Sequence, residues 1–399
     1  MDRTESRVEV PAVGWSAPFV RRADLWTWVL WGVFSLLVVG AAWNSETAAG
    51  VPSIYREAAD DWLAGRKLYD GSGEGFIYLP QSAVFYIPFT WLPVKLSAAA
   101  WRIVNIGVFA WGVWRLSSVA ARQHSVTFFP LASLISVLLA WSAARHGQMT
   151  MVMGGAMMLA AADLADRRWW RAAIWLTVGL AFKPLIVVMM LLAAALYRSV
   201  SWRLLICFVC VCLVPFLTQS PGYVIDQYGQ SAQALVDAFR LGLNNQWAQI
   251  FGMLQSFGIH APDPVPTVIR VVVALVTLGL CWSVQKRHGR DRALVGVWTL
   301  AVCYLLLFNP RTERNTYALI GSAIGIFAAH ALLVDRRTVL AGVSFALVGL
   351  SLLSHPLSKL VSAQPTLWVK PLLCIVFLCL ALRELFAGES ESEVSVDPG

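Results

Sequence analysis

The chain has 399 residues, of which 58% are hydrophobic and only 14% are charged. Soluble domains average about 45–50% apolar and about 25% charged residues, so this composition excludes a single water-soluble globule. It predicts an all-α, polytopic membrane protein built as one helical bundle. The net charge of +8 comes from short basic groups scattered between apolar runs, which argues against a nucleic-acid-binding protein.

Residues 1–20 carry charges of both signs and two prolines, so they do not form a cleaved signal sequence. Because a span needs roughly 20 apolar residues, the chain is expected to form about 12 transmembrane helices, within a range of about 11–13. The candidate segments are 25–43, 98–119, 127–144, 150–164, 170–182, 185–197, 204–217, 265–284, 293–308, 316–334, 339–353 and 366–382.

Basic residues gather in alternate loops, which indicates the orientation of these segments. With residues 1–24 and 385–399 on the same side, all the arginine-rich loops face the cytoplasm of what we expect to be a bacterial plasma (inner) membrane. Residues 25–384 form the transmembrane domain, and the acidic tail 385–399 is expected to be disordered. The groups are Arg21 and Arg22; Arg115 and Arg122; Arg167, Arg168 and Arg171; Arg198 and Arg203; Lys286, Arg287, Arg290 and Arg292; Arg336 and Arg337.

The apolar stretch 76–93 is not counted as a span, because counting it would invert every later loop and because Pro80, Pro88 and Pro93 interrupt it. It is expected to lie at the outer interface. This assignment leaves two long outer loops, 44–97, which contains this stretch, and 218–264. Within the first, residues 52–64 have the spacing of an amphipathic interfacial helix that ends at Gly65.

The strongest local signal is the turn Asn309–Asn315, in which three charges and two amides lie between two apolar segments. Arg311 and Arg314 are suited to bind a phosphate or diphosphate, because guanidinium groups bind phosphate through paired hydrogen bonds. The alternative is that both arginines simply pair with Glu313 in a wet loop. Asn315 closes the turn and is a further candidate for substrate binding.

Three other polar groups fall on the same predicted outer face. Lys183 either binds a lipid phosphate or extends to the headgroups as an anchor. His146 and Gln148 lie in a short turn next to Gly147. Asn245 and Gln246, beside Trp247, are suited to sugar hydroxyls, although a helix cap with an interfacial tryptophan explains them equally well.

Transfer to an alcohol needs a carboxylate that accepts the hydroxyl proton. The candidates are Glu57, Asp60 and Asp61 in the first outer loop and Glu313 in the later turn, with the alternative that Asp60 and Asp61 are only the solvated face of a helix.

The sequence has no nucleotide-binding glycine loop and no zinc motif, and Cys207, Cys210 and Cys212 lack paired metal ligands. We therefore expect neither a metal nor another cofactor.

An ordered set of short motifs lies between Leu25 and Leu350. The motifs are Tyr55, Ala58, Ala59, Leu63, Gly65 and Tyr69; Tyr78-Leu79-Pro80 with Phe85, Pro88, Leu92 and Pro93; Gly147-Gln148; Lys183-Pro184; and Asn245-Gln246. This set resembles glycosyltransferase family 87, of the GT-C superfamily. The resemblance implies a GT-C-like bundle that transfers a sugar, often mannose, from a polyprenol-phosphate donor to a lipid or glycan acceptor on the outer face, with inversion.

The chain departs from the family at one important position. The family's base is an Asp shortly before the first tyrosine, and alignment on Tyr55 places Val51 there. Another of the candidate carboxylates then takes the role, or the usual chemistry is lost.

The second functional hypothesis is a transporter or flippase of lipid-linked sugars, which would use the same cations and no base. The glycosyltransferase hypothesis gains most if Lys183, Gln148, Arg311 and Arg314 line one outward cavity together with a carboxylate from the first outer loop, and it fails if they point to separate faces.

Overall fold

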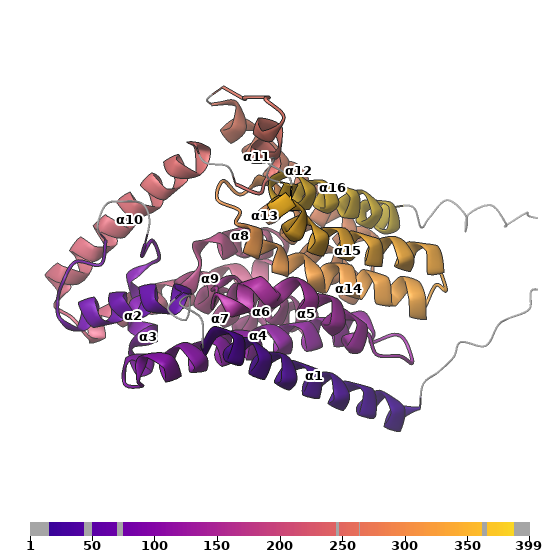
Figure 1. Cartoon of the computed structure of the whole chain (residues 1–399), viewed down its shortest axis with the longest axis horizontal. Coiled ribbons are helices and arrows are strands. Elements are labelled where there is room, and N and C mark those ends of the chain that lie inside the picture. The colour runs from indigo at the N-terminus through magenta and orange to yellow at the C-terminus, as the bar shows by residue number, and fades with distance from the viewer. Residues whose placement is uncertain are drawn as a thin grey trace, which may run out of the picture.

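The computed structural model describes residues 16–43, 50–69, 75–244, 247–262, 264–360 and 365–386, and every regular element in these residues is a helix (Figure 1). The all-α prediction is confirmed. Each of the twelve predicted apolar segments is helical: α1 (Ala17–Trp43), α4 (Val94–Ala120), α5 (Phe129–Arg145), α6 (Thr150–Ala165), α7 (Trp169–Phe182), α8 (Val187–Leu196), α9 (Arg198–Leu213), α12 (Val265–Arg287), α13 (Arg290–Phe308), α14 (Ala318–Leu333), α15 (Thr338–Leu360) and α16 (Pro365–Phe386).

Six helical stretches in the described residues are long and apolar enough to cross a membrane. The predicted count of about twelve spans is not established, because several of the remaining apolar helices are shorter. The break at Lys183-Pro184, for example, leaves α7 with 14 residues and α8 with 10. The six stretches are Ala17–Trp43, Val94–Ala120, Arg198–Leu217, Val265–Arg287, Arg290–Phe308 and Arg314–Leu333.

The bundle has an inner and an outer set of helices. About three quarters of the most apolar window is buried in α13 and in the stretch that contains α14, whereas α1, α9 and α12 bury less than a third of theirs. These outer helices display large apolar side chains such as Leu36, Leu205 and Leu275. An apolar outer surface of this extent needs lipid around it. The chain is an integral membrane protein.

Glycines let the inner helices approach one another closely. A Cβ atom added to Gly155 of α6 would lie 2.5 Å from the carbonyl oxygen of Val108 in α4, and one added to Gly325 of α14 would lie 2.6 Å from the Cα of Ala132 in α5. Small residues at helix crossings are the usual means by which membrane helices pack, because apolar burial alone does not drive association in lipid.

The arginine-rich loops meet at one end of the bundle, which we call the basic end. Arg115 and Arg122 at the end of α4 pair with Asp166 at 2.8 and 2.7 Å, and Arg122 also pairs with Asp291 at 2.9 Å. In Figure 1 the start of α1, the end of α16 and the turn between α14 and α15 all lie at this end. The predicted gathering of basic loops on one side therefore agrees with the structure.

The other end, which we call the site end, carries the helices of the two predicted outer loops: α2 (Gly50–Leu63), α3 (Pro80–Thr90), α10 (Pro221–Asn244) and α11 (Ile250–Ser256) (Figure 1). The α3 helix has 11 residues, about 16 Å, and is too short to cross a bilayer. The α2 helix is the predicted amphipathic helix, and Gly65 follows it with a φ of 67°. Short 3-10 turns η2 (Pro184–Ile186), η3 (Val214–Leu217) and η4 (Arg314–Tyr317) complete the chain.

Several boundaries differ from the sequence-based prediction. The first helix begins at Ala17 rather than Leu25, and Arg21 and Arg22 lie in these first two turns, before its apolar part. The last helix continues to Phe386, past the predicted end of the segment at residue 382 and past the predicted domain boundary at residue 384. Residues 387–399, which make up most of the predicted tail, lie outside the described residues.

Candidate active site

A cavity of about 190 Å³ at the site end brings together residues from four distant parts of the chain. Lys183 comes from the break between α7 and η2, and Arg311 and Glu313 come from the turn after α13. Tyr78 and Ile77 precede α3, and Leu235 and Ala238 of α10 cover one side. Lys183 and Arg311 therefore line one cavity as expected, with Glu313 as its carboxylate, whereas Gln148, Arg314 and the first-loop carboxylates do not line it.

The sequence at the end of α7 determines the backbone conformation of Lys183. A proline follows it, which disfavours helical backbone at Lys183, and Lys183 accordingly has an extended conformation with φ −147° and ψ 111°. Its side chain is only 7% exposed, and its ammonium donates to the Thr150 hydroxyl at 2.8 Å. A cation this buried is far from the solvent-exposed anchor that was the alternative interpretation.

The turn after α13 is rigidly held. The Thr312 hydroxyl lies 3.2 Å from the carbonyl oxygens of Leu305 and Asn309 and is fully buried. The Thr312 carbonyl accepts from the Ala248 amide at 3.0 Å, so the segment after α10 packs directly on the turn. Arg311 lies 5.1 Å from the centre of the Trp247 ring, a cation–π contact.

Glu313 is the carboxylate of this cavity. Its Oε2 accepts from the Gln148 amide at 3.1 Å, so the two predicted site residues are in contact although 165 positions apart. Gln148 is itself 8% exposed and follows Gly147, whose φ of 63° allows the sharp turn before α6. The contact fixes the Glu313 carboxylate toward the cavity.

Tyr78, which lines the cavity, stacks on the fully buried Tyr55 of α2. The rings of Tyr55 and Tyr78 lie 4.9 Å apart, and the Tyr55 hydroxyl donates to the Phe182 carbonyl at 3.0 Å, directly beside Lys183. Burial raises the pKa of Tyr78, and the nearby Glu313 carboxylate raises it further. Tyr78 therefore stays a neutral phenol at working pH and is able to donate a hydrogen bond.

The first-loop carboxylates lie elsewhere. Glu57, Asp60 and Asp61 line a different hollow, between α2 and the start of α4, and do not border the cavity of Lys183. Asp60 is 3.8 Å from Arg56, and Asp61 pairs with Arg66 at 2.6 Å. Two of these three carboxylates, Asp60 and Asp61, therefore form local ion pairs.

The remaining predicted residues in the part of the chain that the structure describes do not line the cavity. His146 Nδ1 lies 2.8 Å from the Ser142 carbonyl, and Asn315 accepts from the Ser142 hydroxyl at 2.6 Å. Arg314 is exposed, and its carbonyl accepts from Lys370 at 2.9 Å. Asn245 and Gln246 lie outside the described residues.

One buried cation near the site escaped the sequence analysis. Arg102 of α4 is 1% exposed, and its guanidinium donates to the carbonyls of Arg145 and Ala98, both at 2.9 Å. It supports the turn that carries His146 and Gln148. An arginine inside an apolar run is itself the signal that could have found it, because such residues are costly in a membrane unless they have a role.

The fold and the cavity identify the class of protein: it is an all-helical integral membrane protein with a polar, largely buried cavity at one end. Residues 76–310, more than half of the chain, match the sequence profile of glycosyltransferase family 87. The chain belongs to glycosyltransferase family 87 and is a glycosyltransferase, so the resemblance seen in the motifs is confirmed. The match ends at Pro310, before Arg311 and Glu313.

Two solved structures are similar to this chain. ArnT from Cupriavidus metallidurans in the apo state is 16% identical, with a TM-score of 0.46, over 91% of this chain and 78% of that chain. The same protein bound to undecaprenyl phosphate is 15% identical, with a TM-score of 0.43, over 90% and 77%. No curated protein matches the chain.

Proposed function

We propose that this glycosyltransferase transfers a hexose, with mannose as the first candidate, from a polyprenol-phosphate donor to a lipid or glycan acceptor at the outer face of the membrane. The observation that carries the proposal is the cavity in which Lys183 and Arg311 lie beside Glu313. Two cations in a buried site suit a phosphate leaving group, and the adjacent carboxylate suits an acceptor hydroxyl.

The proposed reaction is a single displacement. Glu313 accepts the proton of the acceptor hydroxyl, whose oxygen forms a bond to the anomeric carbon. The bond from that carbon to the phosphate oxygen breaks, and the polyprenol phosphate leaves with the electron pair, its charge balanced by Lys183 and Arg311. Attack opposite to the leaving group inverts the anomeric configuration.

In this proposal Glu313 replaces the family's carboxylate, whose position is occupied by Val51. Gln148 supports Glu313 through the 3.1 Å hydrogen bond. Tyr78 shapes the donor side, with Tyr55 stacked behind it. We also assign His146, Arg314, Asn315, Asn245 and Gln246 to substrate binding. Glu57, Asp60 and Asp61 are left without a role in proton transfer.

Incubation of the purified protein with radiolabelled polyprenol-phosphate hexoses and membrane lipids tests the proposal. We expect labelled glycolipid, or slow hydrolysis of the donor when no acceptor fits, and an inverted anomeric configuration by NMR. A folded protein that neither transfers nor hydrolyses any polyprenol-phosphate hexose would refute the donor class. Translocation of such a donor across vesicles without a covalent product would instead support the flippase hypothesis.

A further inference from the structure

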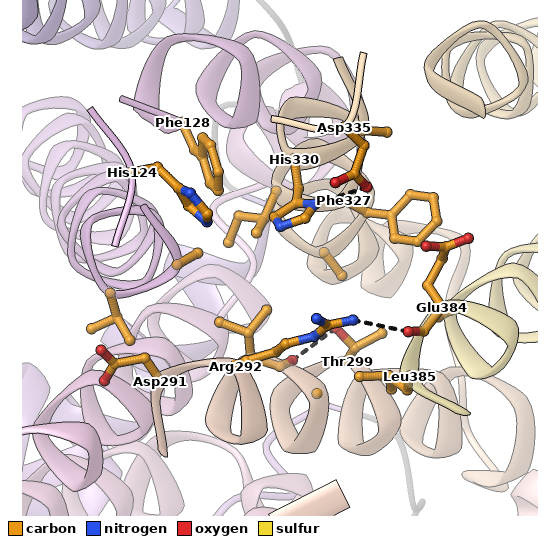
Figure 2. A pocket seen from close by; sticks show the side chains of 18 of the residues that line it. His124, Phe128, Asp291, Arg292, Thr299, Phe327, His330, Asp335, Glu384 and Leu385 are labelled. Carbon is orange, nitrogen blue, oxygen red and sulfur yellow. Dashed lines mark hydrogen bonds and ion pairs between the residues drawn. The ribbon is translucent and has the colours of Figure 1, made fainter. Parts of the chain in front are cut away.

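A second cavity, of about 220 Å³, opens at the basic end of the bundle, away from the candidate active site. It lies between the end of α4, the first half of α13, the second half of α14 and the end of α16. Figure 2 shows His124, His330 and Arg292 around the open space, with Asp335 and Glu384 toward its edge. Nothing in the proposed transfer reaction uses it.

The walls of this cavity form a narrow apolar slot. On α13 the lining residues Arg292, Val295, Gly296 and Thr299 recur at the three- and four-residue spacing of one helix face. The opposite wall is the corresponding face of α14 from Ala323 to His330. Seven residues of helix rise about 10 Å, so the slot runs roughly that far into the bundle from its polar mouth.

The mouth presents positive and hydrogen-bonding groups to the space. Arg292 is exposed, and its guanidinium donates to the backbone carbonyl of Glu384 at 3.0 Å. Among the described residues, no carboxylate forms an ion pair with Arg292. The rings of His124 and His330 lie edge to face with their centres 5.4 Å apart.

The carboxylates at the mouth already have partners of their own. Asp291 pairs with Arg122 at 2.9 Å, and Glu384 pairs with Arg337 at 2.9 Å. Asp335 lies 3.3 Å from Nδ1 of His330. Arg292 is therefore the cation at the mouth that has no carboxylate partner among the described residues. An anion bound there can pair with Arg292 without displacing a carboxylate.

We propose that this slot binds an anionic lipid, with its phosphate at Arg292 and the two histidines and the start of one chain between α13 and α14. A free phosphate would use the mouth but leave the apolar slot empty, whereas a lipid phosphate fills both. Basic pockets between membrane helices on the side that carries the lysines and arginines are suited to lipid phosphates. The site is separate from the active site, so it does not depend on the proposed transfer reaction.

Photo-crosslinking tests the site by binding alone, without turnover. A phosphatidic acid that carries a diazirine in one acyl chain is added to the purified protein in neutral detergent, and crosslinked peptides are mapped by mass spectrometry. We expect labelling on α13 and α14. Arg292→Gln and Val295→Trp should each lower this labelling at least fivefold, the first by removing the cation and the second by filling the slot.

Arg290→Gln is the matched control, because Arg290 lies two residues earlier on α13 and does not line the cavity. It should label as strongly as the unchanged protein. Equal labelling by a diazirine diacylglycerol without phosphate, or unchanged labelling of Arg292→Gln, would overturn the proposal. If inorganic phosphate at millimolar concentration prevents the labelling fully, the site takes a free anion and the lipid assignment is wrong. Arg292 is exposed, so its variant tests the site even if Val295→Trp fails to fold.

Discussion

Glu313 and Gln148 show how much of the proposed chemistry depends on single side chains. Glu313→Gln keeps the size of the side chain and removes its ability to accept a proton. Because general base catalysis contributes about 10²–10⁴-fold, the variant should lose about that factor in turnover, while donor binding stays near normal. Steady-state kinetics with labelled donor measure both quantities.

Glu57→Gln is the control for this variant, because Glu57 is exposed in the hollow between α2 and the start of α4. It should retain nearly full turnover. Full activity in Glu313→Gln combined with a large loss in Glu57→Gln would move the base to the first loop, as the family pattern would have it.

Lys183 is expected to act on donor binding rather than on proton transfer. Replacement by Met keeps the length of the side chain and removes the charge that would face the phosphate. A charge-assisted hydrogen bond contributes about 1.5–3 kcal/mol, so the KM for the donor should rise roughly 10- to 100-fold. Lys95→Met is the comparison, since Lys95 lies near the Trp43 ring, outside the cavity, and its loss should leave KM unchanged. A normal KM in Lys183→Met would exclude the phosphate role.

The residue types of the site were predictable, and their grouping was predictable in part. Lys183, Gln148, Arg311 and Glu313 stand out because each is polar at the end of an apolar run. The sequence could not choose among the carboxylates, because the choice depends on which face of α2 turns inward. Tyr55 and Trp62 take that inner face, which leaves Glu57 and Asp60 outside.

At the scale of elements, the attachment of α2 to the turn before α6 depends on a glycine. Gly147 has a φ of 63°, and a Cβ atom there would lie 2.7 Å from Cγ of Pro52 in α2. Gly147→Ala should therefore lower the free energy of unfolding by about 2–4 kcal/mol, from backbone strain plus overpacking. It should also reduce transfer, since α2 carries Tyr55, which stacks on Tyr78 of the cavity wall.

Gly65→Ala separates the two causes. Gly65 has a similar φ of 67°, but no atom lies within 4 Å of the added Cβ. Only the strain of about 1–2 kcal/mol should appear. Denaturant titration of the detergent-solubilised variants measures the difference, and equal losses in the two variants would show that the contact with Pro52 contributes nothing.

The apolar helices were predictable because burial in lipid leaves a strong signal, and all twelve predicted segments are helical. The α10 helix was not predicted. Both faces of this 24-residue helix mix apolar and polar side chains: Val224, Gln227 and Ser231 are buried, whereas Ile225 and Asp226 are exposed. No continuous apolar run therefore marks the helix in the sequence. Only its contacts with the site end, such as the Leu68 amide donating to Gln227 at 3.0 Å, show what it packs against.

At the scale of the whole molecule, the two ends differ in what we propose that they bind. Helices α6, α7 and α13 each run from the arginine-rich end to the cavity of Lys183 and Glu313, and α13, with 19 residues, spans about 28 Å. This separation is close to the thickness of the hydrocarbon core. A donor phosphate at one end and a lipid phosphate at the other would therefore lie at opposite surfaces of one bilayer.

We expect the basic end to face the cytoplasm, since lysines and arginines gather on the cytoplasmic side of membrane proteins. Single cysteines in a variant without the seven native ones test this orientation. Ser220→Cys, just before α10, should react with a membrane-impermeant maleimide in intact bacterial spheroplasts, whereas Thr338→Cys, at the start of α15, should react only after permeabilisation. Both positions are exposed, so a difference in labelling reports the side and not burial. The reverse pattern would place the candidate active site in the cytoplasm and would exclude transfer at the outer face.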